Sequence, residues 1–226
     1  MEGVSGHDAA ALHTTPPLLK PKLRGVLHQW AAVASLATGA VLLIVADSPR
    51  ARIAAAIYAL SITALLGTSA VYHRVNWRTP SARRWMRRLD HTMIFVLIAG
   101  TYTPFALLVL HGATATGILI AVWSCVVAGA VLKLLWVDAP KALMATLYVA
   151  LGLVSVIATP QLIDRLGILP VCVIALGGAL YVAGAVIYAV RRPDPVPTVF
   201  GYHELFHLLV VLAAACFYAV VLFWVL

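Results

Sequence analysis

Charged residues are scarce in this chain of 226 residues. Asp, Glu, Lys and Arg make up only 11% of it, against roughly 25% in an ordinary soluble domain, whereas hydrophobic residues make up 63%. The mean hydropathy is correspondingly high, at +0.99. So little charge excludes a water-soluble globular domain. We expect an integral protein of the cell membrane, with several spans and one helix bundle as its folded domain.

Cysteine is scarce as well. The three cysteines, Cys125, Cys172 and Cys216, lie within apolar runs and form no zinc-type pair such as C-x-x-C. We interpret them as small buried residues, which excludes a cysteine-based metal site.

The net charge of +8 does not indicate a nucleic-acid partner. The apolar runs leave no surface domain on which a basic face could be displayed. Orientation in the bilayer explains the positive excess better, because loops on the cytoplasmic side are rich in Lys and Arg.

Apolar runs that can cross a bilayer, which takes about 20 residues, recur seven times. The fold class is therefore predicted as all-α, a seven-transmembrane helix bundle formed by residues 20–226 and preceded by a disordered cytoplasmic tail, 1–19. A basic loop, 74–88, is expected after the second span, and Pro160 is expected to end the fifth. The predicted spans are 26–46, 53–72, 90–110, 113–136, 142–159, 169–189 and 208–226.

The distribution of Lys and Arg predicts the orientation of the bundle. Of the sixteen basic residues, all but three fall in the N-terminal segment or in the second, fourth and sixth connections. The opposite side holds only Arg50, Arg52 and Arg165. The positive-inside rule then places the N-terminus in the cytoplasm and, after seven spans, the C-terminus outside.

Two histidines four residues apart open the last apolar run. His203 and His207 would project from one face of a helix, with Cβ atoms roughly 5–6 Å apart, a spacing that suits one metal ion. His73 ends the second span and Asp90 begins the third. In the predicted orientation all four residues share the cytoplasmic end of the bundle, so His73 is expected to be the third nitrogen ligand.

Three histidines and one water form the open tetrahedral arrangement of catalytic zinc. Asp90 is expected to hold or deprotonate that water, and Ser69, one turn before His73, to orient a ligand or the substrate. Simpler roles are open for the same residues. An interfacial histidine often serves only as a hydrogen-bonding residue, and Asp90 could pair with Arg87 or Arg88. His28, His91 and His111 are expected to be ordinary polar residues rather than ligands.

The motifs resemble those of the hemolysin III family, the bacterial branch of the progestin and adipoQ receptor family. They are Ser69-x-x-x-His73, then 89–95 followed by 99–104, and finally Gly201-Tyr202-His203-Glu204-Leu205-Phe206-His207. The resemblance extends from about Lys20 and implies a zinc ion on His73, His203 and His207, with Asp90 close by. It also implies kinship with adiponectin receptors and alkaline ceramidases, whose similar sites hydrolyse lipid amides.

The function predicted from the sequence is therefore that of a zinc-dependent, ceramidase-like hydrolase acting on an acyl-lipid amide or ester. One alternative is a non-enzymatic sensor or regulator of lipid homeostasis with structural zinc, and another is a cytolytic pore. The pore is disfavoured because no stripe of ionisable residues crosses the membrane centre. Glu204 completes an H-E-x-x-H sequence, the metalloprotease signature, but no acidic ligand follows it, so we expect an auxiliary base or a partner for Arg191 or Arg192.

Overall fold

The computed structural model describes residues 20–226, and the predicted disordered tail lies outside this range. Seven helical segments of the described chain are long and apolar enough to cross a membrane, which confirms the predicted number of spans. Their helices are α1 (Val26–Val45), α2 (Pro49–Arg74), α3 (Pro80–Leu108), α4 (Gly112–Leu135), α5 (Lys141–Leu153), α6 (Ser155–Leu166), α7 (Ile168–Val190) and α8 (Tyr202–Val220). Helices α5 and α6 form one span, and the π-helical turn Val221–Val225 extends α8.

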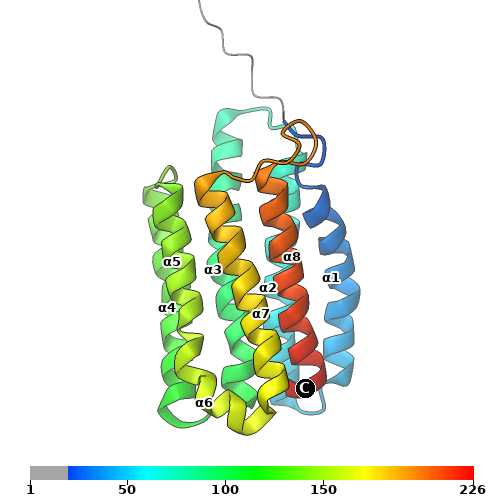
Figure 1. The fold of residues 1–226 in the computed structure, drawn as a ribbon, viewed down its shortest axis with the longest axis vertical. Coiled ribbons are helices and arrows are strands. Elements are labelled where there is room, and N and C mark those ends of the chain that lie inside the picture. The colour runs from blue at the N-terminus through cyan, green and yellow to red at the C-terminus, as the bar shows by residue number, and fades with distance from the viewer. Residues whose placement is uncertain (1–19) are drawn as a thin grey trace, which may run out of the picture.

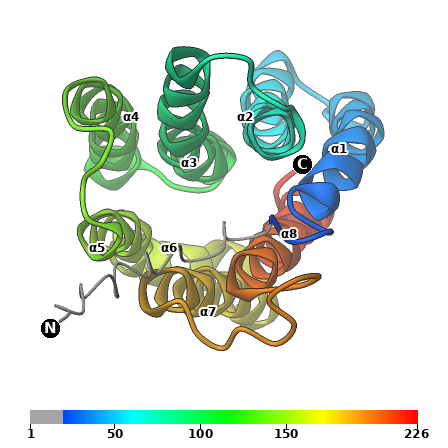
Figure 2. The same ribbon diagram turned by 90° about the horizontal axis from the view of Figure 1, so that it is seen from above.

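Seen along the bundle, the helices form a ring (Figure 2). Helix α2 packs between α1 and α3, α3 also packs on α4, and α8 packs on both α7 and α1, so the last helix closes against the first. Helices α2 and α3 bury the most residues, including Tyr58 and Phe95 in the core.

One end of the bundle, at which α2 ends and α3 and α8 begin, is called the histidine end below. The described chain enters at this end, and the C-terminus lies at the opposite end (Figure 1). Successive spans cross the membrane in opposite directions, so the end of the second span and the starts of the third and seventh lie on the same side. His73, Asp90 and His203 are therefore at the same end of the bundle, as predicted. Which side of the membrane this end faces remains the prediction made from the basic residues.

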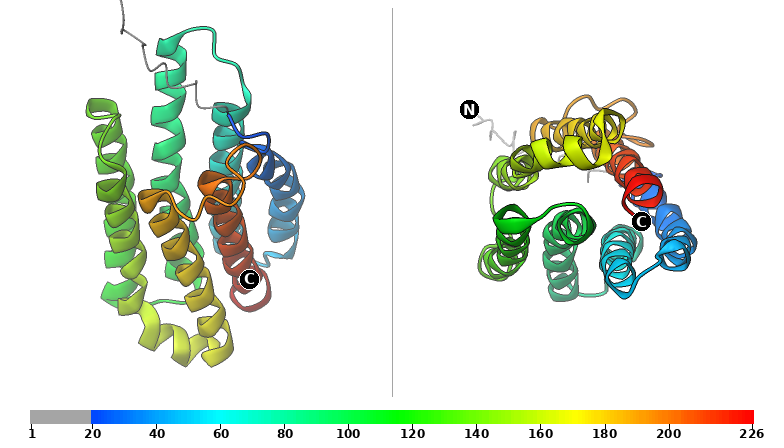
Figure 3. Two further views of the ribbon diagram at one scale, coloured as in Figure 1. Left: turned by 45° about the horizontal axis from the view of Figure 1, so that its top comes forward. Right: turned by 90° about the horizontal axis from the view of Figure 1, so that it is seen from below.

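Helix α3 begins earlier than predicted. The predicted basic loop is helical from Pro80 onward, because the Thr79 hydroxyl accepts a hydrogen bond from the Ala82 amide at 3.2 Å and proline suits the first helical position. Figures 1 and 3 show these first turns reaching beyond the ends of the neighbouring helices. A charged helix is stable there because it need not enter the apolar core of the bilayer.

The prediction that Pro160 ends the fifth span was also wrong. Helix α6 continues through Pro160 to Leu166, and the span is instead interrupted at Val154, between α5 and α6. Proline removes a hydrogen bond from the preceding turn and so bends a helix on its N-terminal side. In this span Pro160 is therefore accommodated within a helix and does not end it.

Candidate metal centre

The last turns of α2 contribute two buried polar side chains. Ser69 and His73 lie one helical turn apart and are both buried. Gly25, just before α1, lies against His73, and a Cβ atom added to it would be 2.7 Å from the His73 Cβ. Gly25 also has a φ of +79°, which favours glycine. The start of α1 therefore passes directly over His73.

The first turn of α8 is fixed by Glu204, which is 1% exposed. One carboxylate oxygen accepts a hydrogen bond from the Gly201 amide at 2.9 Å, and the other pairs with the Arg24 guanidinium. An acidic side chain is also favoured at a helix N-terminus. The partner of Glu204 is thus Arg24, and the expected pairing with Arg191 or Arg192 was wrong.

This turn aims two histidines at the end of α2. One nitrogen from each of His73, His203 and His207 can be chosen so that all three lie within 4.8 Å of one another. The Nε2 atoms of His73 and His203 are 3.2 Å apart. Zinc–nitrogen bonds of about 2.0–2.1 Å in a tetrahedron place two ligand nitrogens roughly 3.3 Å apart. The three histidines therefore fit a zinc ion.

Asp90 lies on α3 at the same end of the bundle, and the Ser69 side chain is close enough to influence its carboxyl group. Within residues 20–226, neither of the two arginines considered as partners forms an ion pair with Asp90. Arg87 pairs instead with Asp138 at 2.6 Å, and Arg88 forms no ion pair. The structure thus places a carboxyl group and a hydroxyl group at the histidine end of the bundle, with the hydroxyl group one turn before His73.

The other histidines lie in different surroundings. His111 is exposed and caps α4 at the opposite end of the bundle. His91 follows Asp90 on α3, but its ring is not part of the cluster, and its carbonyl accepts a hydrogen bond from Tyr148 at 3.2 Å.

His28 belongs to the site, although the sequence did not assign it there. Its ring stacks on that of His207, with centroids 3.8 Å apart and planes 8° apart. A signal for its burial does exist in the sequence. His28 starts the buried stripe of α1, which continues through Ser35, Gly39 and Leu42 at helical spacing.

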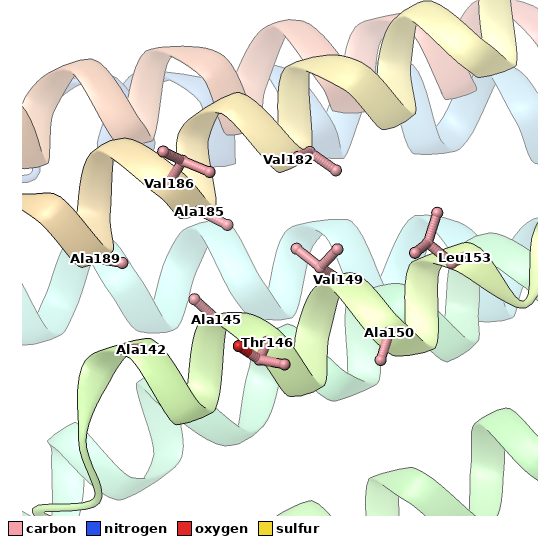
Figure 4. Close-up of a pocket in the computed structure, with 10 residues that line it drawn as sticks. All are labelled: Ala142, Ala145, Thr146, Val149, Ala150, Leu153, Val182, Ala185, Val186 and Ala189. Atoms are coloured by element: carbon pink, nitrogen blue, oxygen red, sulfur yellow. The ribbon is translucent and has the colours of Figure 1, made fainter.

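An apolar groove of about 390 Å³ lies between α5 and α7 (Figure 4). It runs from Ala142 and Ala189, near the histidine end, toward Leu153. Tyr188, next to Ala189, has its ring 5.6 Å from that of His203, centroid to centroid. The Ala142–Ala189 end of the groove therefore lies at the same end of the bundle as the histidine cluster.

Comparisons with known proteins agree with these features. A family model described as "Haemolysin-III related" matches residues 17–218. The chain is 28% identical to "Hemolysin-3" of Bacillus cereus over 89% of its own length and 90% of the relative's. It is 30% identical to the "Hemolysin-3 homolog" of Bacillus subtilis (strain 168), over 74% and 75%. It is also 25% identical to the human "Monocyte to macrophage differentiation factor", over 84% and 78%.

Proposed function

Because the chain belongs to the haemolysin III family of multi-pass membrane proteins, we propose that its histidine cluster is a zinc site that hydrolyses the amide or ester bond of an acyl lipid. The observation that carries this proposal is the convergence of the three histidines. They come from helices 130 residues apart in the chain, yet each offers a nitrogen within 4.8 Å of the others.

In this proposal His73, His203 and His207 hold the zinc ion. Three neutral imidazoles favour zinc and leave a fourth position free, which is typical of catalytic rather than structural sites. When bound there, zinc polarises a carbonyl group and lowers the pKa of a water molecule to about 7.

Asp90 manages the proton in the proposed reaction. Its carboxylate accepts a proton from the attacking water and then returns it to the leaving amine or alcohol. The Ser69 hydroxyl, which is close enough to influence that carboxyl group, orients it. His73 and His207 are buried, and such low-dielectric surroundings strengthen the electrostatic effects of the metal and of the carboxylate.

The groove between α5 and α7 supports a lipid as the substrate. From Ala142 to Leu153, eleven residue steps, α5 rises by about 17 Å, roughly half of a 30 Å hydrocarbon core. One acyl chain of one leaflet can lie along such a groove, with its carbonyl at the histidine end. The basic loops predict that this end faces the cytoplasm, so the lipid is expected to come from the cytoplasmic leaflet.

Elemental mass spectrometry of the purified protein in detergent tests the metal. We expect about one zinc per chain in the parent and almost none in the His73→Ala and His207→Ala variants. A folded parent without zinc, prepared without chelator, would contradict the proposal.

The Asp90→Asn variant tests the chemistry. It should keep its zinc and lose at least a hundredfold in the rate of hydrolysis of a panel of ceramides and other acyl lipids, because a general base typically contributes 10²–10⁴-fold. Hydrolysis that is absent from the zinc-loaded parent would favour a structural zinc site in a regulator of lipid homeostasis.

A cytolytic activity is the second candidate, and the names of the bacterial relatives favour it. Leakage of a dye from phospholipid vesicles containing the purified protein measures it directly. Leakage that persists in zinc-free His73→Ala protein would separate this activity from the metal site.

A further inference from the structure

Helix α1 carries a buried histidine, His28, that has no role in the proposed reaction. His28 is 2% exposed, and within residues 20–226 neither of its ring nitrogens has a hydrogen-bond partner. A buried polar group without a partner is costly to keep. The contact of His28 with the histidine cluster is made through the face of its ring.

The stacking geometry excludes His28 as a fourth ligand of the same ion. A ring nitrogen binds a metal along its lone pair, which lies in the plane of the ring. The planes of His28 and His207 differ by only 8°, with the ring centroids 3.8 Å apart, so the two rings lie face to face. Lone pairs in two such planes run side by side and do not meet at one ion.

The residues just before α1 contact α8 and the segment that leads into it at two further places. Arg24, one turn before His28, pairs with the buried carboxylate of Glu204, which lies between the two histidines of α8. The amide of Leu23 donates a hydrogen bond to the carbonyl of Val199 at 3.1 Å. Three contacts thus fix the start of α8 against the start of α1.

We propose that α1 positions the metal ligands of α8, with His28 acting as a positioning residue that fixes the ring of His207 by stacking on it. The stacked face restricts the His207 ring to one plane, in which a ring nitrogen can point toward His73 and His203. This inference rests on the metal site of the proposed function, since it concerns how that site is held.

Two substitutions of His28 separate stacking from hydrogen bonding. His28→Phe keeps a flat ring and removes both nitrogens, whereas His28→Leu fills the site with an aliphatic side chain and removes the ring. Ser35→Ala is the matched control, because Ser35 is buried on the same face of α1 but bonds Thr63 of α2 at 2.9 Å. Two quantities are measured in detergent: the zinc dissociation constant, by competition with a fluorescent chelator, and the visible spectrum of the cobalt(II)-substituted protein.

The expected result is about tenfold weaker zinc binding by His28→Leu, together with a changed cobalt spectrum, since partners that orient a ligand typically contribute 10–100-fold in metal affinity. His28→Phe should stay within about twofold of the parent and keep its cobalt spectrum, as should Ser35→Ala.

Three outcomes would overturn the inference. If His28→Phe loses as much affinity as His28→Leu, the nitrogens and not the ring face matter. If neither variant differs from the zinc-bound parent, His28 positions nothing, while the proposed function stands. If the parent itself binds no zinc, the proposed function fails first. If His28→Leu does not fold, His28→Phe still tests the inference, because it must keep the zinc affinity and the cobalt spectrum of the parent.

Discussion

Replacing Gly25 by alanine should damage both stability and metal binding, because this residue passes directly over His73. The new methyl group would lie 2.7 Å from the His73 Cβ, and the backbone has a φ of +79°. The left-handed backbone costs about 1–2 kcal/mol for alanine, and the overpacking adds about 1–3 kcal/mol. Together they should lower the free energy of unfolding by about 2–5 kcal/mol.

Gly112→Ala is the matched control for this prediction. Gly112 also has a positive φ, +60°, but a Cβ atom added there meets nothing within 4 Å. The control should lose only the backbone cost of about 1–2 kcal/mol. The difference between the two variants isolates the contact with His73.

Zinc competition and denaturant unfolding in one detergent measure both effects. The displaced His73 ring should weaken zinc binding about tenfold in Gly25→Ala, the lower end of the range for groups that orient a ligand, and not at all in Gly112→Ala. Equal losses of stability in the two variants, with unchanged zinc affinity, would refute the argument that α1 presses on His73.

Three further changes have distinct expected results. Alanine at any of the three clustered histidines should abolish zinc binding, whereas His111→Ala at the opposite end should retain it, as elemental analysis would show. Ala185→Phe should fill the groove and slow lipid hydrolysis with zinc retained, while Ala183→Phe, which does not line the groove, should behave as the parent in the same assay. Arg24→Gln leaves a buried carboxylate without its partner and should cost roughly 2–3 kcal/mol of unfolding free energy. Arg87→Gln removes an exposed pair and should cost less than about 1 kcal/mol in the same measurement.

Much of the fold could be predicted from run length alone. A span needs about 20 apolar residues, and seven such runs give seven helices with little ambiguity. The shared depth of His73, Asp90 and His203 then follows from parity, because the second span ends where the third and seventh begin. The structure confirms the seven spans and brings His73 and His203 together, whereas zinc binding and hydrolysis remain predictions.

The errors in the prediction have local causes. The run 80–88 was interpreted as a loop because it is charged, although Thr79 and Pro80 are typical of a helix start. Hydropathy indicates where a helix leaves the membrane, not where the helix itself ends. Pro160 was taken as a stop, but α6 continues through it to Leu166, because a proline in a membrane helix weakens the helix locally without having to end it.

The contacts made by His28 and Glu204 could not be predicted from the sequence. Arg24 lies 180 residues from Glu204, and Arg191 and Arg192 are far nearer in the chain. Only the packing of α1 against α8 selects the distant partner. The stacking of His28 on His207 depends on the rotation of both helices about their axes, which burial patterns fix only coarsely.

The division of the histidines between α2 and α8 has a consequence for biosynthesis. A chain emerging from the ribosome presents His73 early, but His203 and His207 come only with the last helix. Until α8 inserts and closes the ring against α1, the nascent protein has one of the three nitrogens and cannot form the cluster. Completion of the site thus coincides with completion of the bundle, and a truncated product lacks it altogether.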